Sequence, residues 1–246
     1  MPSDMNRRKF LAATGGVALT AGAAATLPQI AMAQTASPFA ATQAKGAPAM
    51  FKTKPLPFDP QKIKGMSEKM LISHYENNYG GAVKRLNMIA EQLASLDWAA
   101  APGFTVNGLK REELIANNSM LLHELFFDGL GGESEPKGDL TVALTRDFGG
   151  YAPWRSQFMA IGKALGGGSG WVLLTYDPRD KRLVNTWAAD HTMTLAGGKP
   201  ILALDMYEHA YHMDYGAKAA SYVDAFMNAI RWENAASLYE RHSRQA

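Results

Sequence analysis

The spacing of apolar residues indicates two long helices in the first half of the chain. From Met70 to about Leu96, apolar side chains recur every three or four residues, and this period is typical of an amphipathic helix. Ser67 stands where an N-terminal capping side chain is expected, and the glycine pair at 80–81 predicts a kink. A second helix is predicted from about Glu112 to Leu130, with the glycines at 131–132 available to end it. Two helices joined by a loop predict an antiparallel hairpin.

The pattern in the second half changes from helical to β-prone. The segment 147–165 is predicted to be helical. Two β-prone runs, 171–176 and 183–187, flank the turn-forming sequence Asp177-Pro178-Arg179-Asp180, and 201–204 forms a third short apolar run. We therefore predict an α+β protein, in which an N-terminal antiparallel helical hairpin precedes a C-terminal domain with a three-stranded antiparallel sheet and helices.

The stretch directly after the third predicted strand is rich in possible metal ligands. Asp205 and His209 are four residues apart, so their side chains can face one point on a helix or at a strand-to-helix turn. A carboxylate oxygen and an imidazole nitrogen that converge in this way form half of a transition-metal site. The alternative is a helix N-terminus that Asp205 caps, with His209 in an ordinary hydrogen bond. The spacing alone is compatible with both interpretations.

The first 33 residues have the parts of an export signal. Asn6-Arg7-Arg8-Lys9-Phe10-Leu11 precedes a weakly apolar run that ends at Ala31-Met32-Ala33, which gives a charged region, an apolar region and an A-x-A cleavage site. The paired arginines resemble a twin-arginine signal, so we expect a periplasmic protein without a stable membrane anchor. An uncleaved membrane anchor is the alternative. The expected organisation is a signal peptide at 1–33, a linker and extended segment at 34–60, a helical hairpin domain at 61–135 and an α/β domain at 136–246.

Charge and composition exclude several kinds of site and partner. The 246 residues are 47% apolar and 20% charged, which suits one or two domains with a sizeable core. The signal contains three of the 25 basic and one of the 23 acidic residues, so 22 of each remain in the mature chain. We therefore expect no nucleic-acid partner. The chain has no cysteine, which excludes disulfides and thiolate metal sites and leaves histidines and carboxylates as the possible ligands.

Three stretches resemble motifs of the iron/manganese superoxide dismutase family, in the family's order. Asp205-Met206-Tyr207-Glu208-His209-Ala210-Tyr211 resembles the signature DxWEHAYY. The segment 72–79, which contains His74, resembles the family's first helix motif, and 118–127, which contains His123, resembles the second. The segments 147–151, 166–171 and 222–232 are similar to further family motifs. The resemblance covers about residues 55 to 232.

The resemblance implies four metal ligands, namely His74, His123, Asp205 and His209. Three neutral imidazoles and one carboxylate suit Fe or Mn rather than Ca or Mg. The implied reaction is the dismutation of superoxide, in which one superoxide reduces the ion and leaves as oxygen and a second oxidises it and leaves as peroxide. Glu208 resembles the acid that reaches across the family's dimer to a ligand histidine of the other subunit, so a homodimer through Glu208 and His209 is expected.

Several residues around the implied ligands depart from the family pattern. The gateway tyrosine of the family falls on Ala82, and a histidine four residues after the first ligand falls on Asn78. The pocket tryptophans fall on Phe127 and Tyr207, and the tyrosine three residues after the last ligand falls on His212. These differences indicate that the surroundings of the ion are rebuilt while its ligands are retained.

The residue that contacts metal-bound solvent in the family has two possible counterparts here. One alignment places His191 there, and a shift of two residues places Ala189 there. An imidazole can donate or accept a proton near neutral pH. We therefore expect His191, Asn78 and Tyr207 to be the catalytic residues around the ion.

The leading hypothesis is an exported superoxide dismutase with one Fe or Mn ion per subunit. The alternatives are an exported metal-dependent oxidoreductase of the same fold with another substrate, which the missing gateway tyrosine motivates, and a non-enzymatic metal-binding protein. The choice between Fe and Mn, and between dimer and tetramer, stays open at this point.

Overall fold

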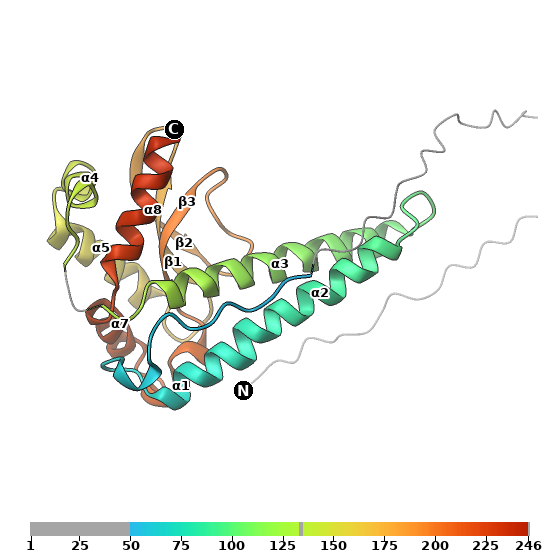
Figure 1. The fold of residues 1–246 in the computed structure, drawn as a ribbon, viewed down its shortest axis with the longest axis horizontal. Coiled ribbons are helices and arrows are strands. Elements are labelled where there is room, and N and C mark those ends of the chain that lie inside the picture. Colours follow the sequence, from blue (N-terminus) through green and yellow to red (C-terminus); the bar gives the residue numbers. More distant parts are fainter. Residues whose placement is uncertain (1–49, 133–134, 246) are drawn as a thin grey trace, which may run out of the picture. The chain divides into compact units, whose positions relative to one another are not determined.

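The computed structural model describes residues 50–132 and 135–245, which belong to one compact unit. Its first half is the predicted helical hairpin. Helix α1 (Glu68–Ser73), the π-helical turn η2 (His74–Tyr79) and α2 (Gly80–Ser95) follow one another without a break. Helix α3 (Gly103–Asp128) runs back beside α2, and Figure 1 shows the two helices lying along each other. The predicted signal at 1–33 and most of the predicted linker lie outside the described residues.

The predicted start of the first helix agrees with the structure, whereas the predicted kink and the predicted bounds of the second helix do not. Ser67 caps α1, because its Oγ accepts a hydrogen bond from the Met70 amide at 3.1 Å. The predicted kink at the glycine pair is wrong, since Gly80 keeps helical dihedral angles and the irregular part is the π-helical turn before it. Helix α3 begins at Gly103, nine residues before the predicted start. The prediction missed these first turns because they are largely exposed and carry no apolar stripe. It is capped by Gly129 and not by the glycines at 131–132.

The predicted three-stranded antiparallel sheet is confirmed. Strands β1 (Trp171–Asp177), β2 (Arg182–Ala188) and β3 (Lys199–Asp205) are arranged in the order β2-β1-β3. Trp171 pairs with Ala188 on one side and with Asp205 on the other. The start of the central strand therefore lies beside the C-terminal ends of both neighbouring strands. The loop after β2 and the segment after β3 thus leave the sheet at the same end of its strands.

The described residues of the C-terminal half form five further α-helices: α4 (Asp139–Phe148), α5 (Tyr151–Ala164), α6 (His212–Tyr215), α7 (Ala219–Asn228) and α8 (Trp232–Arg244). Helix α4 is missing from the predictions, and 147–165 proves to be the end of α4, a turn at Gly149 and Gly150, and α5. The short apolar set of α4, Leu140, Ala143 and Leu144, gives a weak signal in the sequence. Helices α5 and α8 pack on the sheet, and α3 packs on β3.

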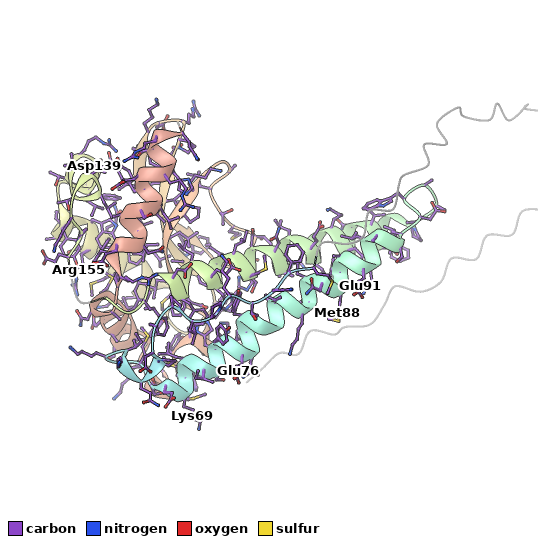
Figure 2. The ribbon with its side chains drawn as sticks, in the orientation of Figure 1. Lys69, Glu76, Met88, Glu91, Asp139 and Arg155 are labelled. Atoms are coloured by element: carbon purple, nitrogen blue, oxygen red, sulfur yellow. The ribbon has the colours of Figure 1, made fainter. Side chains whose placement is uncertain are left out.

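One core joins the hairpin to the sheet. The α3–β3 contact brings Phe126 of the hairpin against Phe226 of α7, with ring centroids 5.9 Å apart. Polar and flexible side chains such as Lys69, Glu76 and Glu91 project outward from the hairpin (Figure 2). Among the described residues, no helix is both long and apolar enough to span a bilayer. The predicted boundary at residue 135 stays a prediction.

Candidate metal centre

Four elements that are distant in sequence bring the four predicted ligands together. His74 opens the π-helical turn, and His123 lies in the last turns of α3. Asp205 is the last residue of β3, and His209 lies in the 3-10 turn η3 (Glu208–Ala210) that follows. One possible ligand atom from each residue lies within 4.8 Å of every other. The predicted convergence of these side chains is therefore present in the structure.

Asp205 is the central group of this cluster. Its Oδ2 atom lies 3.1 Å from His74 Nε2, 3.2 Å from His209 Nε2 and 3.6 Å from His123 Nε2. Its Oδ1 atom accepts a hydrogen bond from the Tyr207 amide at 2.9 Å. The helix-capping interpretation thus describes one carboxylate oxygen, while the other faces three imidazoles.

The separations between these donor atoms fit a shared ion. Two donors bound at about 2.1 Å to one ion lie about 3.0 Å apart at a right angle and about 3.6 Å apart at 120°. The three separations from Asp205 Oδ2 fall close to this range. His123 Nε2 is also buried without a hydrogen-bond partner among the described residues. A buried, unpartnered nitrogen is costly unless it binds something, so the residues present fit a transition-metal ion.

The ring of His123 is held in the orientation and tautomer that a ligand needs. Its Nδ1 atom donates to the Ser119 carbonyl oxygen at 2.6 Å, one helical turn earlier. The proton is therefore on Nδ1 and the lone pair on Nε2, which faces Asp205. Phe127 packs against both His123 and His74, with ring centroids 6.5 Å and 5.1 Å away. These contacts fix the ring and exclude water from one side of it.

Burial sets the charge of the ligands. It lowers the pKa of His74, and it lowers the pKa of His123 to about 3, so both imidazoles are neutral at physiological pH. Burial alone raises the pKa of Asp205, but the charge and hydrogen bond of His209 and the hydrogen bond of His74 outweigh it and hold that pKa well below its usual range. The cluster therefore presents two neutral imidazoles, those of His74 and His123, and one anionic oxygen ligand, the protonation states that bind a metal ion.

His191, and not Ala189, lies against the ligand cluster. Its ring centroid is 6.1 Å from that of His123. Its Nδ1 atom accepts a hydrogen bond from Trp171 Nε1 at 3.0 Å, and its backbone carbonyl accepts one from Asn118 Nδ2 at 2.6 Å. Burial lowers the pKa of His191. Since Nδ1 is an acceptor, the neutral ring carries its proton on Nε2.

The other two predicted catalytic residues differ in how they relate to the cluster. The ring of Tyr207 stacks between His191 and His209, at centroid distances of 4.8 Å and 5.3 Å. Burial raises the pKa of Tyr207 to about 12, so its phenol stays protonated. Asn78, together with Ala82 and His191, lines a cavity beside the cluster.

The sequence analysis missed three residues that hold the site in shape. Ser119 orients His123, Trp171 donates to His191, and Asn118 fixes the backbone of the His191 loop. Ser119 stands four residues before a candidate ligand, a spacing that places both on one helix face and is visible in the sequence. The roles of Trp171 and Asn118 depend on which loop packs beside them and carry no such local signal.

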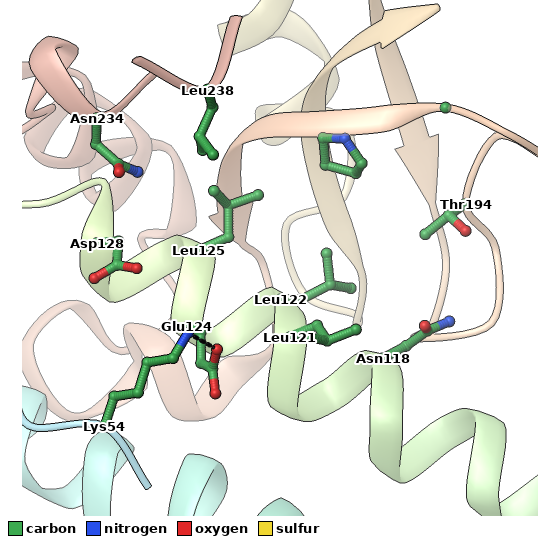
Figure 3. Close-up of a pocket in the computed structure, with 12 residues that line it drawn as sticks. Lys54, Asn118, Leu121, Leu122, Glu124, Leu125, Asp128, Thr194, Asn234 and Leu238 are labelled. Atoms are coloured by element: carbon green, nitrogen blue, oxygen red, sulfur yellow. Dashed lines mark hydrogen bonds and ion pairs between the residues drawn. The ribbon is translucent and has the colours of Figure 1, made fainter. Parts of the chain in front are cut away.

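A groove of about 360 Å³ lies outside the ligand cluster (Figure 3). Leu121, Leu122 and Leu125 of α3 line it, and Lys54 and Glu124 form an ion pair at its rim. None of the four candidate ligands is among the described residues that line this groove. The groove is therefore not the place where the ligand cluster meets a substrate.

Comparison with known proteins identifies close relatives. Residues 136–238 match the family described as iron/manganese superoxide dismutases, C-terminal domain. A superoxide dismutase [Fe] of Cupriavidus metallidurans is 65% identical over 190 residues, which are 77% of this chain and 96% of that protein. A superoxide dismutase [Mn] of Haloarcula marismortui is 35% identical, over 76% of this chain and 92% of that protein. A superoxide dismutase [Fe] of Aquifex pyrophilus is 34% identical, over 74% and 88%.

Proposed function

This chain belongs to the iron/manganese superoxide dismutase family, and we infer that it disproportionates superoxide to oxygen and hydrogen peroxide at one Fe or Mn ion. The observation that carries this function is the 65% identity to an iron enzyme across nearly the whole of that relative. The convergence of three histidines and one aspartate supports the same conclusion independently of the alignment.

We propose that His74, His123, Asp205 and His209 hold the ion. Their nitrogen and oxygen donors suit either metal. The relatives of this chain include proteins named superoxide dismutase [Fe] and superoxide dismutase [Mn]. When bound, the ion supplies one-electron chemistry by alternating between two oxidation states. The protein holds the imidazoles of His74 and His123 neutral, fixes the ring of His123 through Ser119, and keeps the carboxylate of Asp205 ionised.

Metal reconstitution tests this function directly. Protein reconstituted separately with Fe and with Mn should contain one ion per chain and should turn over superoxide with at least one of the two metals. Bound metal with only slow turnover would favour an oxidoreductase of the same fold with another substrate. Loose, variable stoichiometry would favour a metal-binding protein without enzymatic activity.

We propose that His191 relays protons to and from the reacting centre. Ala82 offers no hydroxyl group, while His191 lies beside His123 and carries a proton on Nε2 when neutral. Replacing His191 with alanine should therefore lower turnover by about 10²–10⁴-fold, the usual contribution of a positioned acid or base. The pH profile should change, and metal content should stay near one ion per chain. A variant with the wild-type rate and pH profile and with its metal retained would exclude this role.

We propose an isologous dimer in which Glu208 of one subunit meets His209 of the other. Glu208 is exposed, and the side chain of His209 is 26% exposed, so this edge of the cluster is open at the surface of one subunit. Glu208→Ala should shift the protein toward monomer in sedimentation and should weaken metal retention by about 10–100-fold, as expected when the partner that orients a ligand is lost. A metal-loaded, active wild-type monomer would contradict the proposal.

We propose that the chain is exported to the periplasm through its N-terminal twin-arginine sequence. The support is the order of Arg7, Arg8, Phe10 and Leu11 ahead of an apolar run and an A-x-A site. Replacing both arginines with lysine should retain the unprocessed protein in the cytoplasm. Cell fractionation with mass spectrometry of the N-terminus measures this, and unchanged processing would contradict it.

A further inference from the structure

The groove of about 360 Å³ in Figure 3 has the size of a small-molecule site and lies apart from the candidate metal centre. Pockets that bind small molecules have volumes of about 300–1,000 Å³. The groove is lined by one face of α3, by α8, by the start of β3 and by the loop after β2. None of the four candidate ligands is among its described lining residues, and neither is Asn78, Ala82 or His191. A molecule bound here is therefore separate from the surroundings of the ion.

One end of the groove carries polar groups that lack a partner. Asp128 of α3 and Asn234 of α8 lie at this end (Figure 3). The Nδ2 atom of Asn234 is buried and has no hydrogen-bond partner among the described residues. The half-buried carboxylate of Asp128 makes no hydrogen bond or ion pair with these residues either. Because a buried donor or anion without a partner is costly, this end suits a molecule that carries both a cation and a hydrogen-bond acceptor.

Leucines from both helices follow directly after this polar end. Leu125 precedes Asp128 by three residues on α3, and Leu238 follows Asn234 by four residues on α8, so each leucine shares a helix face with its polar neighbour. Leu121, which is 50% exposed, extends the apolar surface along α3 (Figure 3). The groove therefore joins a polar end to an apolar body, which suits an amphipathic molecule.

The charges that line the groove favour a cation at the polar end. Lys54 forms an ion pair with Glu124, whose other carboxylate oxygen accepts a hydrogen bond from Tyr79 Oη at 3.0 Å. The charges of Lys54 and Glu124 compensate each other, which leaves Asp128 as the uncompensated charge among the described lining residues. An ammonium group is attracted to this carboxylate, whereas a second carboxylate is repelled.

We propose that the groove binds the amino-terminal residue of short peptides, where that residue has an aliphatic side chain. The ammonium group pairs with Asp128, the carbonyl oxygen accepts a hydrogen bond from Asn234 Nδ2, and the side chain packs against Leu125 and Leu238. A simple polyamine offers no acceptor to Asn234, and a free amino acid brings a second anion toward Asp128. The proposal goes beyond the dismutase function, because a peptide is neither substrate nor product of that reaction.

Calorimetric titration of the metal-loaded full chain with leucinamide tests the proposal, because this small compound carries all three groups. N-acetylleucinamide lacks the ammonium, glycinamide lacks the aliphatic side chain, and isoamylamine lacks the carbonyl. We expect saturable binding of leucinamide. Binding should be at least about tenfold weaker for N-acetylleucinamide, which loses a charged hydrogen bond, and for glycinamide, which loses the apolar contact. Isoamylamine should bind more weakly than leucinamide by a smaller factor, since it loses a neutral hydrogen bond.

Variants of the protein test the same contacts from the other side. Asp128→Asn keeps the shape of the side chain and should weaken leucinamide binding at least about tenfold. Asn234→Leu should weaken the binding of leucinamide but not that of isoamylamine. Asp224→Asn is the matched control, because it removes one negative charge from an exposed side chain outside the groove, and its affinity should equal that of the wild type. Metal content and dismutase activity, which report an intact fold, should stay at wild-type values in all three variants.

Four results would overturn the proposal. The absence of saturable leucinamide binding would exclude the site. Equal affinity for leucinamide and isoamylamine would mean that the groove takes a simple alkylammonium ion. Equal weakening in Asp128→Asn and Asp224→Asn would mean that the ligand responds to the overall charge of the protein. Dissociation of a protein oligomer by leucinamide, measured by sedimentation, would mean that a second copy of the chain occupies the groove instead.

Discussion

Replacing Asp205 with asparagine is expected to remove the metal and, with it, the dismutase activity. The substitution keeps the shape of the side chain but replaces the anionic oxygen that faces three imidazoles with a neutral amide. Loss of a partner that only orients a ligand costs about 10–100-fold in metal affinity, so loss of the anionic ligand itself should exceed about 100-fold. Metal content per chain, measured after dialysis against a weak chelator, is the primary readout.

A surface aspartate provides the control for this substitution. Asp224 lies on α7, is 53% exposed and pairs with Lys163. Asp224→Asn changes the net charge by the same amount and should leave metal content and turnover unchanged. If Asp205→Asn retained a full complement of metal with wild-type activity, the assignment of Asp205 as a ligand would be wrong.

The metal-free protein is expected to lose stability steeply as the pH falls below about 6.5. Burial holds the pKa of His74 below its ordinary value of 6.5 and that of His123 at about 3. Below about pH 6.5 these two histidines are protonated in the unfolded chain but not in the folded chain, so unfolding takes up protons. The free energy of unfolding therefore decreases as the pH decreases. A histidine that is protonated only in the unfolded chain contributes about 1.4 kcal/mol per pH unit, and His123 does so from about pH 6 down toward its folded pKa of about 3. Urea unfolding of chelated protein at several pH values measures the slope.

The carboxylate of Asp205 acts in a different pH range. Because its folded pKa is lowered, the stability that it contributes is present above its unfolded value and is lost only at more acidic pH. The slope between about pH 6 and 4 therefore reports mainly the buried histidines. His123→Gln should make it shallower by about 1.4 kcal/mol per pH unit. A flat profile in the wild-type protein, or an unchanged slope in this variant, would contradict the neutral, buried state of these rings.

The sequence predicts well what depends on local periodicity. The hairpin helices, the three strands and the capping role of Ser67 follow from residue spacing and from side chains within a few positions of each other. Helix α4 escapes such reasoning because only a few of its side chains are buried. The kink predicted at the Gly80–Gly81 pair was wrong because glycine permits a bend without requiring one, and the neighbouring turns hold α2 helical.

The residue types that are available to bind a metal are visible in the sequence, and the resemblance to a family selected four residues among them. Without cysteine, the ligands had to be histidines and carboxylates, and the Asp205–His209 spacing was visible along the chain. The tertiary structure alone decided that His191 rather than Ala189 faces the cluster, and that Trp171 and Asn118 hold it there. The physical reason is that the loop after β2 has no periodicity of its own, and its position depends on packing against α3 and against the first residue of β1.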